Sequence, residues 1–205
     1  MRTAAVSGQM HEQSGATSTF TWEDDLRGNI PEFHKVMRSA NSVHAVVSGH
    51  GSAGHQEDGK NRSLPPQVSW GMPPLHLPGV VLSRELNNPL YSLRIVADES
   101  GLMHIRTAWK LNSVTASVTA QDWFFDPVTN LPAKVQYLLP NTLNPSRKAA
   151  ASLVFGDFRA VSGVLAPFNL TGYGADRKIR TFMIQDLKIN VPIDPTHFEL
   201  NGGQQ

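Results

Sequence analysis

In QDWFFDPVTNLPAKVQYLL, residues 121–139, two apolar runs lie on either side of the turn sequence Asp126–Asn130. Pro favours an early turn position and Asn tolerates positive φ, so these residues predict a tight turn. After the turn an apolar set alternates with a polar set: Ala133, Val135, Tyr137 and Leu139 against Lys134 and Gln136. This period of two predicts a strand hairpin with one buried face.

The same pattern continues toward the C-terminus. Ser152–Val161 and Val164–Thr171 are β-rich and are joined by the turn pair Ser162-Gly163. A Gly-bearing turn over Gly172–Lys178 then leads into Ile179–Val191, whose apolar residues fall on both faces of a strand. Strands at this spacing, joined by such turns, predict an antiparallel meander.

The length and composition of the chain predict one domain. With 205 residues and 40% hydrophobic residues, the chain can bury one sizeable core. Residues 1–17 mix Gly, Ser, Thr, Ala and Gln with charges, and this composition predicts a disordered segment. We therefore expect a single β domain over residues 18–200, followed by a short tail over residues 201–205.

The segment that follows residue 17 is less regular. A helix is expected to begin at Asn29-Ile30-Pro31, because apolar residues then recur at helical spacing: Ile30, Phe33, Val36, Met37 and Ala40. A strand pair around Arg38–Asn41 is the alternative. Ser42–Val47 is predicted as a strand, and Ser48–Pro66 as a long polar loop.

The middle of the chain adds a cover and a second hairpin. Trp70–Pro78 interleaves prolines with apolar residues and is expected to lie over apolar surface in an extended form. Gly79–Asn87 is predicted as a short helix, Leu90–Ala97 and Leu102–Lys110 as a hairpin, and Leu111–Ala120 as a connector or strand. The expected fold class is mainly β (α+β): a curved antiparallel sheet forming an unclosed half-barrel, with one or two short helices and a Pro-rich cover.

Charge and composition exclude several classes of partner and site. Lys and Arg number 18 against 17 Asp and Glu, without the basic stripe of a nucleic-acid groove. We therefore expect no nucleic-acid partner. The chain has no Cys, which excludes disulfides, thiolate nucleophiles and zinc-thiolate sites.

The hydropathy of the chain predicts a protein that does not span a membrane, because no run approaches the ~18 apolar residues of a membrane helix. The segment Met1–Thr19 contains Gly, Ser, Gln, His and Glu where a signal peptide needs an apolar region. A cytoplasmic protein and a start that is not the natural one are both open interpretations.

Two short patterns suggest chemistry and have simpler explanations. Gly49–Gly54 matches GxGxxG, but the polar sequence HQEDGK follows it in place of the apolar helix of a dinucleotide site, so we interpret it as a flexible loop. His50 and His55, near Glu57 and Asp58, are five residues apart on a loop, unlike the helical i, i+4 pair of a zinc site. We expect no metal and no cofactor.

The sequence offers no catalytic motif. Patterns of the GxSxG, SxxK, HExxH and P-loop types are absent, and most acidic residues lie in predicted turns. The other histidines are scattered singly and are interpreted as surface or core residues: His11, His34, His44, His76, His104 and His197. We therefore expect a protein that is not an enzyme. An enzyme that uses His50, His55 or His104 is the least favoured alternative.

Three segments carry a pattern known from one family: Asp126–Pro132, Gly163–Phe168, and Lys188–Asp194 followed by Phe198. They resemble the strand and turn signatures of bacterial proteins with the outer-membrane lipoprotein carrier (LolA-like) fold, over about residues 120–200. The resemblance implies a curved, unclosed sheet capped by helices, whose concave face holds acyl chains of a lipoprotein. It also implies a periplasmic location.

These observations favour a non-enzymatic carrier of the bacterial envelope that binds a hydrophobic ligand, either an acyl chain or a lipoprotein. The ligand is expected to contact apolar residues of the sheet and cover: Trp70, Leu77, Val135, Tyr137, Phe155, Phe168, Leu170, Phe182 and Ile184. The alternative is an interaction or envelope-sensing module with a filled core, which binds a protein partner through an edge strand or hairpin tip.

Overall fold

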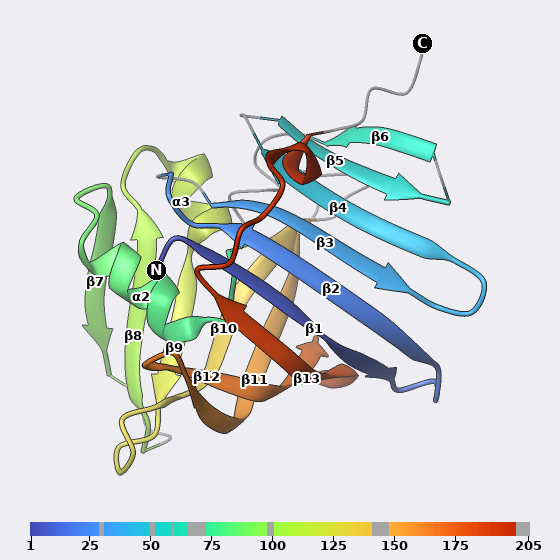
Figure 1. Cartoon of the computed structure of the whole chain (residues 1–205). Coiled ribbons are helices and arrows are strands. Elements are labelled where there is room, and N and C mark those ends of the chain that lie inside the picture. The colour runs from blue at the N-terminus through green and yellow to red at the C-terminus, as the bar shows by residue number, and fades with distance from the viewer. Residues whose placement is uncertain are drawn as a thin grey trace.

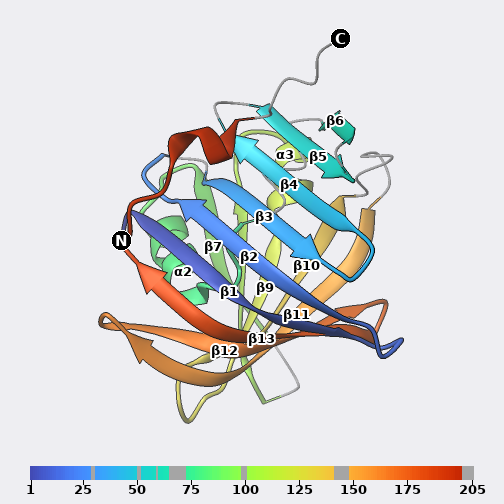
Figure 2. The ribbon, with the colours of Figure 1, turned by 45° about the vertical axis from the view of Figure 1, so that its right-hand side comes forward.

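The computed structural model describes residues 1–28, 31–49, 52–58, 60–64, 73–97, 101–140 and 148–199. Within these ranges the chain forms one antiparallel sheet of 13 strands, ordered β6-β5-β4-β3-β2-β1-β13-β12-β11-β10-β9-β8-β7. The sheet is unclosed, because β6 and β7 are its two edges. Figures 1 and 2 show it curling around α2, so that it has an inner and an outer face. The expected mainly-β, half-barrel fold is confirmed.

The strands are β1 (Thr3–Glu12), β2 (Thr17–Asp25), β3 (Glu32–Arg38), β4 (Val43–Gly49), β5 (Ser52–Glu57), β6 (Lys60–Leu64), β7 (Tyr91–Val96), β8 (Met103–Trp109), β9 (Gln121–Phe125), β10 (Pro132–Pro140), β11 (Lys148–Val161), β12 (Val164–Gly174) and β13 (Arg177–Ile189). The helices are α2 (Pro78–Leu86) and α3 (Ser113–Thr119), and the 3-10 helix η1 spans Pro195–Phe198.

The predicted C-terminal meander is confirmed, since β9 to β13 pair in sequence order. The turns have the backbone geometry that their residues favour. Asn130 before β10 has φ 56°, and Ser162 and Gly163 between β11 and β12 have φ 48° and 80°. Positive φ at both central residues gives a two-residue loop the twist of the strands that it joins. The predicted helix near residues 79–87 and the hairpin of β7 and β8 are confirmed as well.

The N-terminus is ordered, so the prediction of disorder over residues 1–17 is wrong. β1 lies between β2 and β13 and therefore joins the N-terminal strands to the C-terminal meander. Its small residues alternate regularly, with Ala4, Val6, Gly8 and Met10 buried on the inner face. The polar composition concealed this period of two, because the residues between them are mostly polar or small.

A substitution at Gly8 tests the placement of β1. A Cβ atom there would collide with the backbone oxygen of Met183 and lie 2.9 Å from Cζ of Phe20. Gly8→Ala is expected to lower the free energy of unfolding by about 1–3 kcal/mol, as measured by urea denaturation. The matched control is Gly156→Ala in β11, where the nearest atom would be 3.8 Å away. Equal stability of the two variants would contradict the pairing of β1 with β13.

The predicted helix after residue 28 is also wrong, and the alternative strand pair is correct. β3 and β4 form a hairpin through Ser39 and Ser42. Phe33 on the inner face and Val36 on the outer face are both buried. The apolar residues of β3 therefore do not alternate with polar ones, and their spacing of three residues resembles that of a helix. Asn29 and Ile30 lie outside the described residues.

Two further segments differ from prediction. The expected loop Ser48–Pro66 contains β5 and β6, whose buried Ala53 and Leu64 pack against Val46. The expected flexible loop at Gly49–Gly54 is therefore strand from residue 52 onward. Within Leu111–Ala120 the helix α3 begins with a capping box: Thr115 N donates to Asn112 Oδ1 (2.9 Å), and Asn112 N donates to Thr115 Oγ1 (3.1 Å).

Candidate functional site

The inner face of the sheet carries the main hydrophobic core, which fills much of the concave space beside α2. Six residues expected to contact a ligand belong to this core and are buried: Leu77, Val135, Phe155, Phe168, Leu170 and Ile184. Leu170 also lines a cavity on the inner face, together with the half-buried Tyr137 and Phe182. Trp70 lies outside the described residues. The structure thus divides the predicted lining between a packed region and an open one.

The cavity has a volume of about 230 Å³ and lies between the two sides of the curved sheet, under the described end of the Pro-rich segment. Strands β2 to β4 contribute one wall and β10 to β13 the other. Its wall is mainly apolar and aromatic: Trp22, Met37, Val46, Leu75, Tyr137, Leu139, Leu153, Leu170, Ile179 and Phe182. Such a surface binds a ligand by removing apolar area from water.

Two cations interrupt this apolar wall. Lys35 of β3 and Arg180 of β13 both line the cavity. Burial lowers the pKa of Lys35, and the nearby Asp24 carboxylate acts in the opposite direction. Burial raises the pKa of Tyr137 to about 12, whereas Arg180 acts to lower it. Arg180, together with the protonated form of Lys35, would offer complementary charge to an acidic group at one end of an apolar ligand.

The Pro-rich segment is fixed to the sheet by a buried polar pair. His76 Nε2 lies 3.0 Å from Asp24 Oδ2, with 2% and 0% of the two side chains exposed. The centroid of the His76 ring also lies 5.0 Å from the ring centroid of Trp22, which lines the cavity. Because residues 73–77 contact the sheet in this way, the expected cover exists over the part of the Pro-rich segment that is described.

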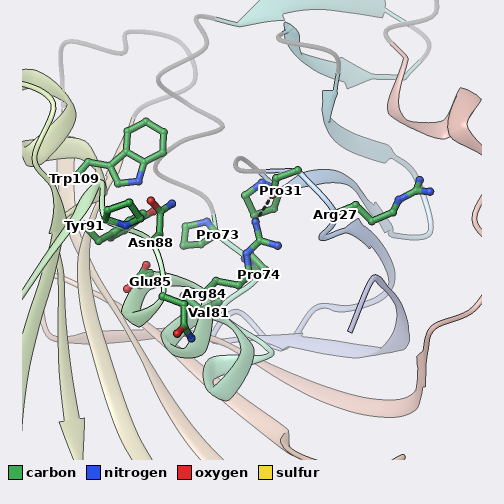
Figure 3. A pocket seen from close by; sticks show the side chains of 13 residues that line it. Arg27, Pro31, Pro73, Pro74, Val81, Arg84, Glu85, Asn88, Tyr91 and Trp109 are labelled. Atoms are coloured by element: carbon green, nitrogen blue, oxygen red, sulfur yellow. Dashed lines mark hydrogen bonds between the residues drawn. The ribbon is translucent and has the colours of Figure 1, made fainter.

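A second, more polar pocket of about 320 Å³ lies at α2 (Figure 3). Glu85 of α2, Tyr91 of β7 and Trp109 of β8 contribute to its wall, and the two aromatic rings meet edge to face at 5.8 Å. Arg84 donates to the backbone oxygens of Leu26 and Gly28. This contact ties α2 to the connection that follows β2.

Glu85 is the unusual acid of this pocket. Its carboxyl is buried and accepts a hydrogen bond from Gln121 Nε2 at 3.2 Å. Burial raises the pKa of Glu85 to about 7, and the hydrogen bond from Gln121 acts in the opposite direction. Burial also raises the pKa of Tyr91. A carboxyl of this kind exchanges a proton near neutral pH, and it titrates where ordinary glutamates do not.

The histidines considered for catalysis do not converge. His104 lies on the outer face, where its Nε2 is 2.7 Å from Asp122 Oδ1, and Arg106 pairs with the same carboxylate. Burial acts to raise the pKa of Asp122, but the hydrogen bonds from Arg106 and His104 outweigh it, and the pKa is below its ordinary value. His55 lies in β5, near the opposite edge of the sheet. His50 is outside the described residues.

The residues considered for a metal site are partly brought together. His55 and Glu57 of β5 meet His44 of β4 on the inner face, with ligand atoms within 4.8 Å of one another. Asp58 does not join them, because its Oδ1 accepts a hydrogen bond from Val43 N in the turn after β5. Two cations of β6, Arg62 and Lys60, stand opposite His55 and Glu57 in the strand register. Their charge disfavours a bound cation.

The polar residues at the cavity and at α2 were not predicted. Four of these residues come from separate segments, and no local sequence pattern links them: Asp24, Lys35, His76 and Arg180. The sequence signal that could have identified Lys35 is its place on the buried face of a strand, which the helix prediction concealed. Glu85 could have been found as the acid on the buried face of α2.

Comparisons with known proteins show a common fold. No protein-family model matches the chain, and no curated protein matches it. A crystal structure of a domain assigned to outer membrane lipoprotein sorting, from Vibrio parahaemolyticus, is similar with a TM-score of 0.63 and 11% identity, covering 96% of this chain and 89% of that chain. The crystal structure of a DUF1329 family protein from Desulfovibrio piger is similar with a TM-score of 0.57 and 12% identity, and the match covers 97% of this chain and 90% of that chain. The crystal structure of a LolA superfamily protein from Nitrosomonas europaea is similar with a TM-score of 0.56 and 10% identity, and the match covers 96% of this chain and 89% of that chain.

At these identities the likeness concerns the fold. The chain has the fold of the LolA superfamily over nearly its full length, and the resemblance inferred from residues 120–200 is confirmed at that level. Among the described residues, no helix is both long and apolar enough to cross a membrane.

Proposed function

We propose that this chain is a non-enzymatic carrier of the bacterial envelope that binds an acyl chain, free or attached to a lipoprotein, in the cavity of the inner face. The supporting observation is the cavity itself, an apolar space between sheet and cover with Lys35 and Arg180 in its wall. The likeness in fold to a lipoprotein-sorting domain is consistent with this function. The same likeness supports a periplasmic location.

The ligand of this proposal has an apolar chain and an acidic end. Tyr137, Leu170 and Phe182 would contact the chain, and the two cations would face the acid. Burial of apolar surface contributes about 25 cal/mol per Å² before the costs of ordering, which is enough for useful affinity without a catalytic group. Because the cavity is smaller than the ~300–1,000 Å³ of common ligand sites, it holds only part of a long acyl chain.

A fluorescent fatty acid tests the proposal. Protein freed of lipid and detergent is expected to bind cis-parinaric acid saturably. Ala151→Trp places a large ring in the cavity and is expected to weaken binding at least about tenfold, because the ring occupies the space of the ligand. The matched control is Ala150→Trp, at the exposed neighbouring position on the outer face. A folded wild-type protein that does not bind the fatty acid would overturn the proposal.

A second candidate function is an interaction or envelope-sensing module with a filled core. The observation that favours it is the burial of Leu77, Val135, Phe155, Phe168, Leu170 and Ile184 within the core, because buried core residues are packed against one another. On this hypothesis the fatty acid does not bind, while an envelope protein is captured through the edge strands β6 or β7. The same titration therefore separates the two candidates.

A further inference from the structure

Three residues that are far apart in sequence meet on the outer face of the sheet. Glu23 of β2 stands directly opposite His34 of β3 in the strand register, so their side chains lie on the same face. His197 comes from η1, which contacts β3 and β4 (Figure 1). The ligand atoms of Glu23, His34 and His197 all lie within 4.8 Å of one another.

The spacing of these atoms suits a small metal ion. His197 Nδ1 lies 2.7 Å and His34 Nδ1 3.6 Å from the same oxygen, Oε2 of Glu23. Ligand atoms that surround a tetrahedral zinc ion are about 3.3 Å apart, given bonds of about 2.0–2.2 Å. The two measured distances lie on either side of this value. Shifts of less than about 1 Å would therefore place both imidazoles and the carboxylate around one ion.

The cap of η1 and the packing of Phe198 hold His197 in place before any ion binds. Asp194 Oδ1 accepts a hydrogen bond from Thr196 N at 2.9 Å and fixes the start of η1. Phe198 is buried, and it lies so close to β4 that a Cβ atom on Gly49 would be 2.7 Å from the Cβ atom of Phe198. His197 is thus positioned from both sides, and little ordering remains to be done by the ion.

The surroundings of the three residues also favour a cation. A cavity of about 140 Å³ adjoins them, and its described wall holds His34, His197 and Glu199 with the neutral donors Gln56 and Asn61. Within the described part of that wall there is no Lys or Arg, and the guanidinium whose charge acts on His34 is that of Arg38 in the same strand. The His44, His55 and Glu57 group differs in this respect, because Arg62 and Lys60 stand opposite it.

We propose that Glu23, His34 and His197 form a binding site for a divalent transition-metal ion, with zinc as the best fit, which fastens the C-terminal segment to β2 and β3. Two imidazole nitrogens and one carboxylate oxygen suit zinc, whereas magnesium and calcium prefer oxygen ligands throughout. A fourth ligand would come from water or from Glu199. The site lies on the outer face, away from the lipid cavity, and its existence does not depend on the proposed function.

Zinc titration of untagged, chelator-treated protein tests the site. Isothermal titration calorimetry is expected to show one ion per chain. His34→Gln and His197→Gln are each expected to weaken zinc binding at least about tenfold, since loss even of a supporting hydrogen bond costs about 10–100-fold. His44→Gln, which alters the other cluster, is the matched control and is expected to leave the affinity unchanged. Equal effects of all three variants, or none, would show adventitious binding and overturn the proposal.

A variant that keeps all three ligands tests the geometry. Gly49→Ala is expected to displace Phe198 and η1 and so to weaken zinc binding about tenfold or more in a protein that remains folded by circular dichroism. Hydrogen exchange provides the second measurement: zinc is expected to slow exchange in residues 195–199 of the wild type and not of His197→Gln. Exchange in this segment that is the same with and without zinc would contradict the proposed role.

Discussion

Replacement of His76 with leucine is expected to lower the free energy of unfolding by about 3 kcal/mol, because the substitution removes the imidazole 3.0 Å from the fully buried Asp24 carboxyl and leaves Lys35 as the nearby cation. The effect should be large since neither side chain is accessible to water, and an unpaired buried charge is far more costly than a lost surface pair. Urea denaturation at neutral pH measures it.

The control for this prediction removes the acid as well. The double variant Asp24→Asn, His76→Leu is expected to regain part of the lost stability, because the amide that replaces the carboxylate carries no charge, although Lys35 then loses the nearby carboxylate. A loss of less than about 1 kcal/mol in His76→Leu would mean that the pair is open to water. The described end of the Pro-rich segment would then not be a cover packed on the sheet.

Glu85 is expected to make stability depend on pH. Its folded-state pKa of about 7 is above its ordinary value of 4.5, so its contribution is fully present below about pH 4.5 and is lost as the pH rises through about 7. Between about pH 5 and pH 8 the loss amounts to about 2–3 kcal/mol. Glu85→Gln stays neutral, and it is therefore expected to be more stable than the wild type at pH 8 by about this amount.

Thermal or urea denaturation at the two pH values checks the Glu85 prediction. The matched control is Glu12→Gln, at an exposed position near the end of β1, which is expected to follow the wild type at both pH values. If Glu85→Gln and the wild type lost the same stability between pH 5 and pH 8, the carboxyl of Glu85 would not be buried as the structure has it.

The C-terminal half was predictable because local chemistry determines it. Asn130 and the pair Ser162-Gly163 adopt positive φ at the turns that they were expected to form, and the strands between them alternate. Turn residues and a period of two are local signals, so they need no knowledge of distant partners. The family resemblance rests on the same segments.

The N-terminal half was not predictable in the same way, because its strands depend on neighbours that are distant in sequence. β1 pairs with β2 on one side and with β13 on the other, and β13 is more than 150 residues away in sequence. The small residues of β1 suit close packing against Met183 and Phe20. β3 is buried on both faces, which removed its alternation. β5 and β6 form an edge hairpin of polar residues, and such residues resemble a loop in sequence.

The candidate sites were predictable only in part, for the same reason. Tyr137, Leu170 and Phe182 belong to strands whose inner face could be inferred. Lys35 was assigned to a helix, and its position in the cavity follows from the pairing of β3 with β2 and β4. His34 and His197 each looked isolated, because the contact between them depends on where η1 docks.

Photo-cross-linking with a palmitate analogue that carries a diazirine near its methyl end is the most direct measurement of where an acyl chain binds. The proposed carrier function predicts cross-links to inner-face residues of the cavity, such as Met37, Leu153 and Phe182, and their loss in Ala151→Trp. Cross-links confined to the outer face of the folded protein, or labelling that is equal in Ala151→Trp and the wild type, would contradict it.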